Sequence, residues 1–176
     1  MGLVHIYCGD GKGKTSAAVG LAVRAAGCGK RVVIARFLKT DNSGEVEILK
    51  KIPEVTLIPC RKTFGFVRSM DEETKRECAA YHRKLFGEAV KLAEHADLVV
   101  FDEIMAAVNY GMVPERDVLE FLENRPGRDQ TDRLEIVLTG RDPSEKLIAA
   151  ADYVSEICKR KHPFDCGIMA RRGVEY

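Results

Sequence analysis

Short apolar runs alternate with amphipathic stretches along the whole chain. Six runs have the length and the β-branched content of buried strands, and they cover residues 3–8, 31–37, 55–59, 98–103, 134–138 and 153–158. Between most of them, apolar residues recur at helical spacing over 17–25, 45–51, 71–95 and 114–124. The pattern therefore predicts one α/β domain over residues 1–176, with a mostly parallel sheet of about six strands flanked by helices.

The later part of the chain carries local signals for where helices begin. Pro114 fits the first turn of the fourth helical pattern, because proline lacks the amide hydrogen that this turn leaves unpaired. After the fifth strand, Asp142, Pro143 and Glu145 are expected at the N-cap, N1 and N3 positions of a further helix. Residues 125–133 are polar and are predicted to form a connection.

A glycine-rich segment follows the first strand directly. There, backbone N–H groups and the positive end of the next helix converge on one point, which favours phosphate. Lys14 can reach the outer phosphates, and the Thr15 hydroxyl is placed to ligate a magnesium ion. Compared with the strict Walker A pattern, the first glycine is one residue late, because Cys8 stands in its place. The residues expected to bind phosphate are Gly9, Asp10, Gly11, Lys12, Gly13, Lys14, Thr15 and Ser16.

Two carboxylates end the fourth strand. Four apolar residues followed by Asp102 match the Walker B pattern, and Glu103 comes next. In nucleotide-binding sheets such a strand is expected beside the phosphate-loop strand, with its acid directed at the magnesium ion. The expected metal site is Thr15, Asp102 and Glu103.

Other polar groups fall at the carboxyl edge of the predicted sheet, where doubly wound sheets keep their ligands. Arg141 is expected to be free there to meet a phosphate or carboxylate, and Lys39 and Asp41 are candidates by position alone. Residues 61–68 place two phenylalanines around Gly65 between cations and complete no helical or strand stripe. Two interpretations of these phenylalanines stay open: they cover a flat apolar ligand, or they are core residues at the end of a loop.

Composition narrows the possible partners. The 176 residues carry a net charge of +1, which favours neither nucleic acid nor an anionic membrane as the main partner. The six cysteines form no C-x-x-C pair and are expected to be reduced thiols. No secretory signal or apolar run of bilayer length is found, so a cytoplasmic location is expected.

Taken together, these motifs resemble the P-loop type of ATP:corrinoid adenosyltransferases over nearly the whole chain. The most diagnostic part is the tail K-H-P-F-D-C-G, which begins at Lys161 and has no counterpart in generic ATPases. The resemblance also rests on G-D-G-K-G-K-T from residue 9, R-F-L-K from 36, F-D-E-I from 101, N-Y-G from 109 and L-T-G-R from 138. It implies a single P-loop NTPase domain of the RecA-like kind.

The resemblance also implies a reaction and its participants. Co(I) of a corrinoid would attack the ribose C5′ of ATP, and the whole triphosphate would leave. Lys14, Lys12 and Glu103 are then the expected catalytic residues, the lysines neutralising the triphosphate and Glu103 lying beside the metal ion. ATP as cosubstrate, Mg²⁺ (or Mn²⁺), an electron-donating flavoprotein reductase and a homodimer are implied as well. Further ligand-binding residues would be Arg141, Phe66, His162 and Phe164.

One departure from the family pattern keeps other functions open. Where the family has tryptophan in its G-F-T-W segment, this chain has Arg68, and it contains no tryptophan at all. This leaves open how the lower ligand of cobalt is displaced and which corrinoid is preferred. One alternative is a RecA-like ATPase in which Glu103 polarises water. Another is a nucleotide-dependent corrinoid carrier without turnover.

Overall fold

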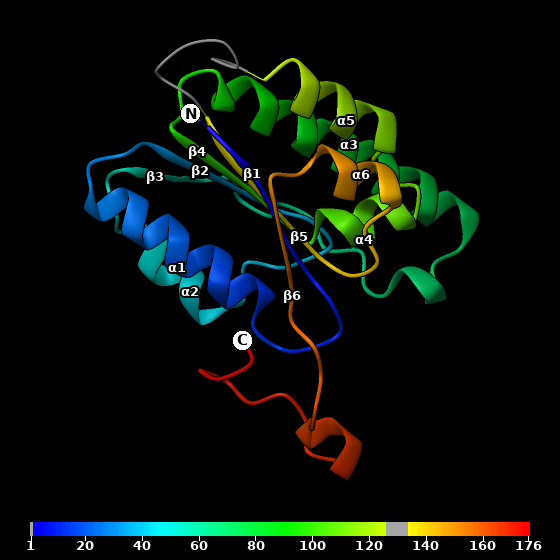
Figure 1. Cartoon of the computed structure of the whole chain (residues 1–176). Helices are drawn as coiled ribbons and strands as arrows, with labels where there is room; N and C mark the ends of the chain where they lie inside the picture. The colour runs from blue at the N-terminus through cyan, green and yellow to red at the C-terminus, as the bar shows by residue number, and fades with distance from the viewer. Residues whose placement is uncertain (1, 126–133) are drawn as a thin grey trace.

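The computed structural model describes residues 2–125 and 134–176, so the predicted connection over 125–133 lies almost entirely outside the described residues. Six strands form one sheet in the order β3-β2-β4-β5-β1-β6, and every neighbouring pair is parallel. This confirms the predicted α/β class (Figure 1). The strands are β1 Val4–Cys8, β2 Val32–Arg36, β3 Val55–Leu57, β4 Leu98–Asp102, β5 Glu135–Thr139 and β6 Tyr153–Glu156.

Helices cover both faces of the sheet (Figure 1). One layer contains α1 and α2, and the opposite layer contains α3 to α6, which agrees with the two separate hydrophobic cores to which these helices contribute. The helices are α1 Lys14–Gly27, α2 Gly44–Leu49, α3 Glu72–Ala93, α4 Ile104–Asn109, α5 Glu115–Glu123 and α6 Glu145–Ala150. Two 3₁₀ turns, Val67–Ser69 and Pro163–Cys166, lie outside these layers.

Burial on both faces explains the continuous apolar runs. All five residues of β2 and all five of β4 are buried, as expected for central parallel strands. Alternate side chains enter separate cores, because successive residues of a strand point to opposite faces. On the α1 side the core includes Val32, Ile34, Leu98 and Val100, and on the other side Val33, Ala35, Val99 and Phe101.

The structure corrects one expectation about the sheet. β4 was expected next to β1, but β5 lies between them in the strand order. β5 pairs with both neighbours, through Phe101↔Leu138 on one side and Ile6↔Leu138 on the other. Insertion of one strand puts β1 and β4 about 10 Å apart at ordinary strand spacing. Asp102, at the end of β4, therefore contacts Thr15 of the phosphate loop across the end of β5.

Two helix starts also differ from the sequence-based prediction. The N-cap of α6 is Ser144, whose side chain accepts a hydrogen bond from the Leu147 amide, so the assignment of Asp142, Pro143 and Glu145 to N-cap, N1 and N3 is wrong. Asp142 instead has a left-handed backbone with φ of 51°. Pro114 is the N-cap of α5 and not a residue of its first turn.

Candidate active site

A large cavity, about 1000 Å³ in volume, opens at the carboxyl edge of the sheet. The loops after β1, β2, β4 and β5 all contribute to it, as parallel strands require, together with the segment before α3 and the C-terminal tail. Eleven of the fourteen residues expected at the site line this cavity, and they are Asp10, Gly11, Lys12, Gly13, Lys14, Thr15, Ser16, Phe66, Glu103, Arg141 and His162. Of the other three, Gly9 and Asp102 contact lining residues, whereas Phe164 lies on the exposed tail.

The phosphate loop ends at the start of α1 without a side-chain cap. Gly13 is the N-cap residue with φ of 122°, and no side chain among the described residues caps this end, so its amides face the cavity unpaired by a cap. The Lys14 ammonium folds back to donate to the carbonyl oxygens of Gly9, at 2.7 Å, and Gly11, at 2.8 Å. Burial, and then the nearby positive charge of Arg141, lower the pKa of Lys14. This arrangement provides cationic and amide donors for an anion.

The displaced glycine of the loop has a structural reason. Gly11 donates its amide to Ile157 O at 2.7 Å, so the phosphate loop lies against the chain that leaves β6. A Cβ atom on Gly9 would come within 2.5 Å of that same oxygen, and one on Gly11 within 2.6 Å. Gly9 also has φ of 100°, which favours glycine. Asp10 completes the contact by accepting the Lys159 amide at 2.8 Å.

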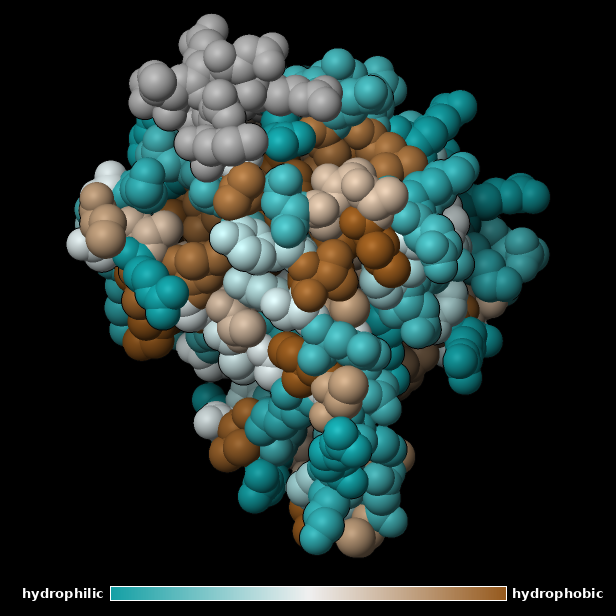
Figure 2. All heavy atoms as spheres, in the orientation of Figure 1, coloured by the Kyte–Doolittle hydropathy of each residue, from teal (hydrophilic) through white to brown (hydrophobic). Residues whose placement is uncertain are grey.

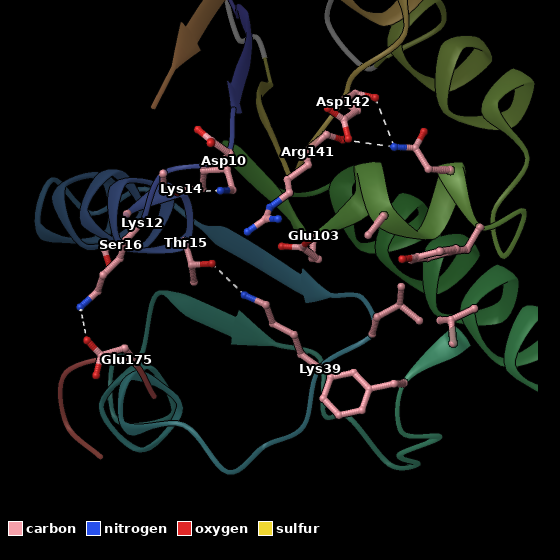
Figure 3. A pocket seen from close by; sticks show the side chains of 18 of the residues that line it. Asp10, Lys12, Lys14, Thr15, Ser16, Lys39, Glu103, Arg141, Asp142 and Glu175 are labelled. Atoms are coloured by element: carbon pink, nitrogen blue, oxygen red, sulfur yellow. Dashed lines mark hydrogen bonds and ion pairs between the residues drawn. The ribbon is translucent and has the colours of Figure 1, made fainter. Parts of the chain in front are cut away.

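Asp102 is the centre of a polar cluster at the floor of the sheet edge, and Asp102 itself is only 2% exposed. Its Oδ1 accepts hydrogen bonds from Thr15 Oγ1 at 3.0 Å and from Thr139 Oγ1 at 2.7 Å. Its Oδ2 lies 2.5 Å from Lys39 Nζ, and this ammonium also donates to Thr15 Oγ1 at 2.7 Å (Figure 3). Sequence reasoning gave Thr139 no role, and it selected Lys39 only by position.

The donor set here fits Mg²⁺, with substrate completing the coordination. Thr15 and Asp102 offer hard oxygen donors, which magnesium prefers. Among residues 2–125 and 134–176, no three His, Cys, Asp or Glu side chains are grouped so as to cage a metal. Magnesium in nucleotide sites is commonly held by one or two protein oxygens and the phosphates of the nucleotide. Glu103 lines the same cavity, and its amide donates to Thr139 Oγ1 at 2.8 Å.

Strained backbone is concentrated around this cavity. In the described part of the chain, three non-glycine residues have positive φ: Leu38 at 52°, Glu103 at 63° and Asp142 at 51°. All three line the cavity. Left-handed backbone costs an L-residue about 1–2 kcal/mol and clusters at functional sites, so these loops are held by their surroundings in a fixed shape.

α4, which the sequence-based interpretation missed, supports the loop after β5. Asn109 at its end donates from Nδ2 to the carbonyl oxygens of Arg141 and Asp142, both at 3.2 Å. The Arg141 guanidinium then points into the cavity near Lys14 and Glu103 (Figure 3). The expected position of Arg141 at the sheet edge is therefore confirmed.

The two phenylalanines before α3 have different environments. Phe64 packs against the core, with its ring centroid 5.6 Å from that of Tyr81 and 4.9 Å from Lys62 Nζ. Phe66 is 87% exposed and lines the cavity, as does Arg68. The core interpretation therefore holds for Phe64, while Phe66 is left without core contacts in a position to meet a ligand.

The C-terminal tail returns to the phosphate loop. Glu175 Oε1 lies 3.0 Å from Lys12 Nζ (Figure 3), and hydrogen bonds from Arg171 are the main cause that lowers the pKa of Glu175 to about 2. The tail projects from the body of the protein, and brown apolar side chains interrupt its teal surface (Figure 2). Its exposed apolar side chains are Phe164, Ile168, Met169 and Val174.

This combination of a parallel sheet, a glycine-rich loop opening α1 and a hydrogen bond between Thr15 and Asp102 defines a P-loop nucleotide-binding protein. The family model described as "ATP:corrinoid adenosyltransferase BtuR/CobO/CobP" matches residues 1–176. The chain belongs to the ATP:corrinoid adenosyltransferase family, whose members transfer the adenosyl group of ATP to a corrinoid in cobalamin biosynthesis.

Similar proteins agree with this assignment. The chain is 34% identical to the corrinoid adenosyltransferase of Escherichia coli K12 and 34% identical to the corrinoid adenosyltransferase CobA of Salmonella typhimurium, in each case over 99% of this chain and 86% of the relative. It is 31% identical to the corrinoid adenosyltransferase of Pseudomonas aeruginosa, over 99% of this chain and 84% of the relative. No helix in the described part of the chain is long and apolar enough to cross a membrane.

Proposed function

We propose that this chain transfers the 5′-deoxyadenosyl group of ATP to the Co(I) centre of a corrinoid. An electron pair of Co(I) forms the cobalt–carbon bond at the ribose C5′ while the C5′–O bond breaks, and inorganic triphosphate leaves with that bonding pair. No proton needs to be removed, so the protein needs cations and positioning groups in place of a general base. The observation that carries the proposal is a cavity that joins a cationic phosphate loop to an exposed aromatic segment.

The phosphate half of the cavity would hold the triphosphate. Lys14, Lys12 and Arg141 supply positive charge there, and the uncapped amides at the start of α1 add hydrogen-bond donors. Thr15 and Asp102 would hold Mg²⁺, with Glu103 at the same edge. When bound, the ion offsets negative charge that develops on the leaving phosphate oxygens.

The opposite half would receive the corrinoid. Phe66 offers an unobstructed aromatic face, and His162 and Arg68 border the same space. With tryptophan absent, the proposal assigns to Phe66 the apolar contact that would help displace the lower cobalt ligand. The exposed tail, including Phe164, would close over this half when both substrates are bound.

The family resemblance supports three further parts of the proposal. The enzyme would act as a homodimer in the cytoplasm, and an electron-donating flavoprotein reductase would reduce Co(II) of the corrinoid to Co(I). The exposed apolar side chains of the tail are consistent with burial against a partner subunit or a bound corrinoid.

The test is an anaerobic assay with purified protein, MgATP and chemically reduced cob(I)alamin, followed by visible spectroscopy and chromatography of the phosphate product. A light-sensitive adenosylcobalamin and one equivalent of triphosphate are expected. ADP and phosphate without a cobalt–carbon bond would instead identify an ATPase with Glu103 as the hydrolytic base. Bound corrinoid with neither product would identify a carrier.

A further inference from the structure

The Lys39 ammonium lies beside Asp102, where a bound metal ion would otherwise supply positive charge. It lies 2.7 Å from Thr15 Oγ1 and 2.5 Å from Asp102 Oδ2, which are side-chain oxygens of the two residues proposed to hold the metal ion. Among the described residues, Lys39 is the ion-pair partner of Asp102. A carboxylate as buried as Asp102 needs such a partner, because an unpaired buried charge is strongly destabilising.

The loop that carries Lys39 is built to hold the side chain in this direction. Arg36, at the end of β2, is buried, donates from Nη1 to Thr40 O at 2.8 Å and pairs with Asp41. Leu38 has left-handed backbone and packs against the core, so the residue before Lys39 is fixed as well. The side chain then crosses the floor of the cavity to reach Thr15 (Figure 3).

We infer that Lys39 is an internal counter-ion that closes the proposed metal site of the nucleotide-free enzyme, so that a divalent cation is retained only together with ATP. This inference rests on the proposed metal site at Thr15 and Asp102. The pair of Lys39 and Asp102 is neutral, and a metal ion entering alone would meet an ammonium at short range. Repulsion between two unit charges about 4 Å apart near a protein surface is large enough to weaken binding by well over tenfold.

A nucleotide changes this balance because it brings negative charge with the metal. The cavity beside Lys39 is open, and the same space is lined by the phosphate loop. A phosphate oxygen there gives the ammonium a new anionic partner when it leaves Asp102. Lys39 is thus a positioning residue that couples metal binding to nucleotide binding, and its removal affects metal affinity differently with and without ATP.

The test measures Mn²⁺ binding to the purified protein, through the electron paramagnetic resonance signal of the Mn²⁺ that stays free in solution. Without nucleotide, Lys39→Met is expected to bind Mn²⁺ roughly tenfold or more tightly than wild type, because the competing charge is gone. Lys39→Arg keeps the charge and should remain like wild type. Lys12→Met removes a cation from the same cavity whose ion-pair partner is Glu175 and not Asp102, so it should not open the site.

A second uncharged variant, Lys39→Gln, and a second measurement, the melting temperature, keep the test valid if Lys39→Met does not fold. Lys39→Gln can still hydrogen-bond to Asp102, and its melting temperature should rise with added Mn²⁺ more than that of wild type. Equal Mn²⁺ affinity of Lys39→Met, Lys39→Gln and wild type without nucleotide would overturn the inference. Asp102→Asn distinguishes an error in the Lys39 inference from an error in the proposed metal site. If that substitution leaves Mn²⁺ affinity in the presence of ATP unchanged, the proposed metal site at Thr15 and Asp102 is wrong.

Discussion

Thr139 is the side chain that joins the two acidic residues of the site, and its replacement by valine tests that geometry. The Thr139 hydroxyl donates to Asp102 Oδ1 at 2.7 Å and accepts the Glu103 amide at 2.8 Å, and Thr139 is fully buried. Thr139→Val preserves the shape of the side chain and removes both hydrogen bonds. The left-handed backbone of Glu103 then loses its amide partner, and Asp102 loses one of its two hydroxyl donors.

The magnitude follows from the charge and burial of the acceptor. A hydrogen bond to an ionised group contributes about 1.5–3 kcal/mol, and an unpaired amide adds about 1 kcal/mol. We therefore expect the free energy of unfolding of Thr139→Val to fall by about 3 kcal/mol. With a urea m-value of about 2 kcal/mol/M, the midpoint should fall by about 1.5 M. Thr139→Ser is the matched control, because it keeps the hydroxyl and loses only one methyl group. Loss of that methyl group should lower the free energy of unfolding by about 1 kcal/mol.

Urea unfolding followed by circular dichroism measures both variants, and Mn²⁺ affinity in the presence of ATP gives a reading at the site. Thr139→Val should weaken metal binding more than Thr139→Ser, because Asp102 is less firmly oriented. Midpoints that agree within about 0.3 M for the two variants would refute the reasoning, since loss of the two hydrogen bonds would then cost no more than loss of one methyl group.

Three further changes test other parts of the site and core. Lys14→Ala should depress turnover much more than corrinoid binding, because its ammonium faces the phosphate loop; unchanged turnover at saturating ATP would contradict its role. Phe66→Ala should slow the reaction of cob(II)alamin more than that of prereduced cob(I)alamin, and equal losses would exclude a part in lower-ligand displacement. Burial lowers the pKa of His82 from 6.5 to about 4, so the folded protein takes up this proton less readily than the unfolded chain. The free energy of unfolding should fall by up to about 3 kcal/mol as the pH falls from about 6.5 to about 4, and His82→Leu should flatten that part of the profile in urea titrations; an unchanged slope would count against this account.

Local patterns were enough to predict the sheet and the phosphate loop. The central strands are short apolar runs because both of their faces are covered, and the loop is visible because glycine is needed at Gly9 and Gly11. The order of the strands is a different matter. Whether β5 or β1 lies next to β4 depends on long-range pairing, and the apolar composition of β5 suits either position.

The cluster around Asp102 was hidden for the same reason. Thr139 is 37 residues away in sequence and Lys39 is 63 residues away, and neither residue differs locally from an ordinary strand-end threonine or loop lysine. The start of α6 was misplaced because Asp142, Pro143 and Glu145 are a plausible capping sequence. In the structure Ser144 is the N-cap of α6. Asp142 lies in the loop before it, with left-handed backbone, and Asn109 donates a hydrogen bond to its carbonyl oxygen.

Strand order also explains why the cation that pairs with Asp102 needs a long side chain to reach Thr15 as well. In the order β2-β4-β5-β1, the end of β2 lies three strand spacings, or about 14 Å, from the end of β1. Only an extended side chain on the loop after β2 can reach the hydroxyl of Thr15, and Lys39 does so at 2.7 Å. The phosphate loop and the Phe66 segment follow β1 and β3, which are four strand spacings, or about 19 Å, apart in the sheet. Both segments line one cavity, which leaves room there for two substrates. The insertion of β5 adds one strand spacing to each of these distances, so it widens the site and lengthens the reach that the Lys39 side chain makes.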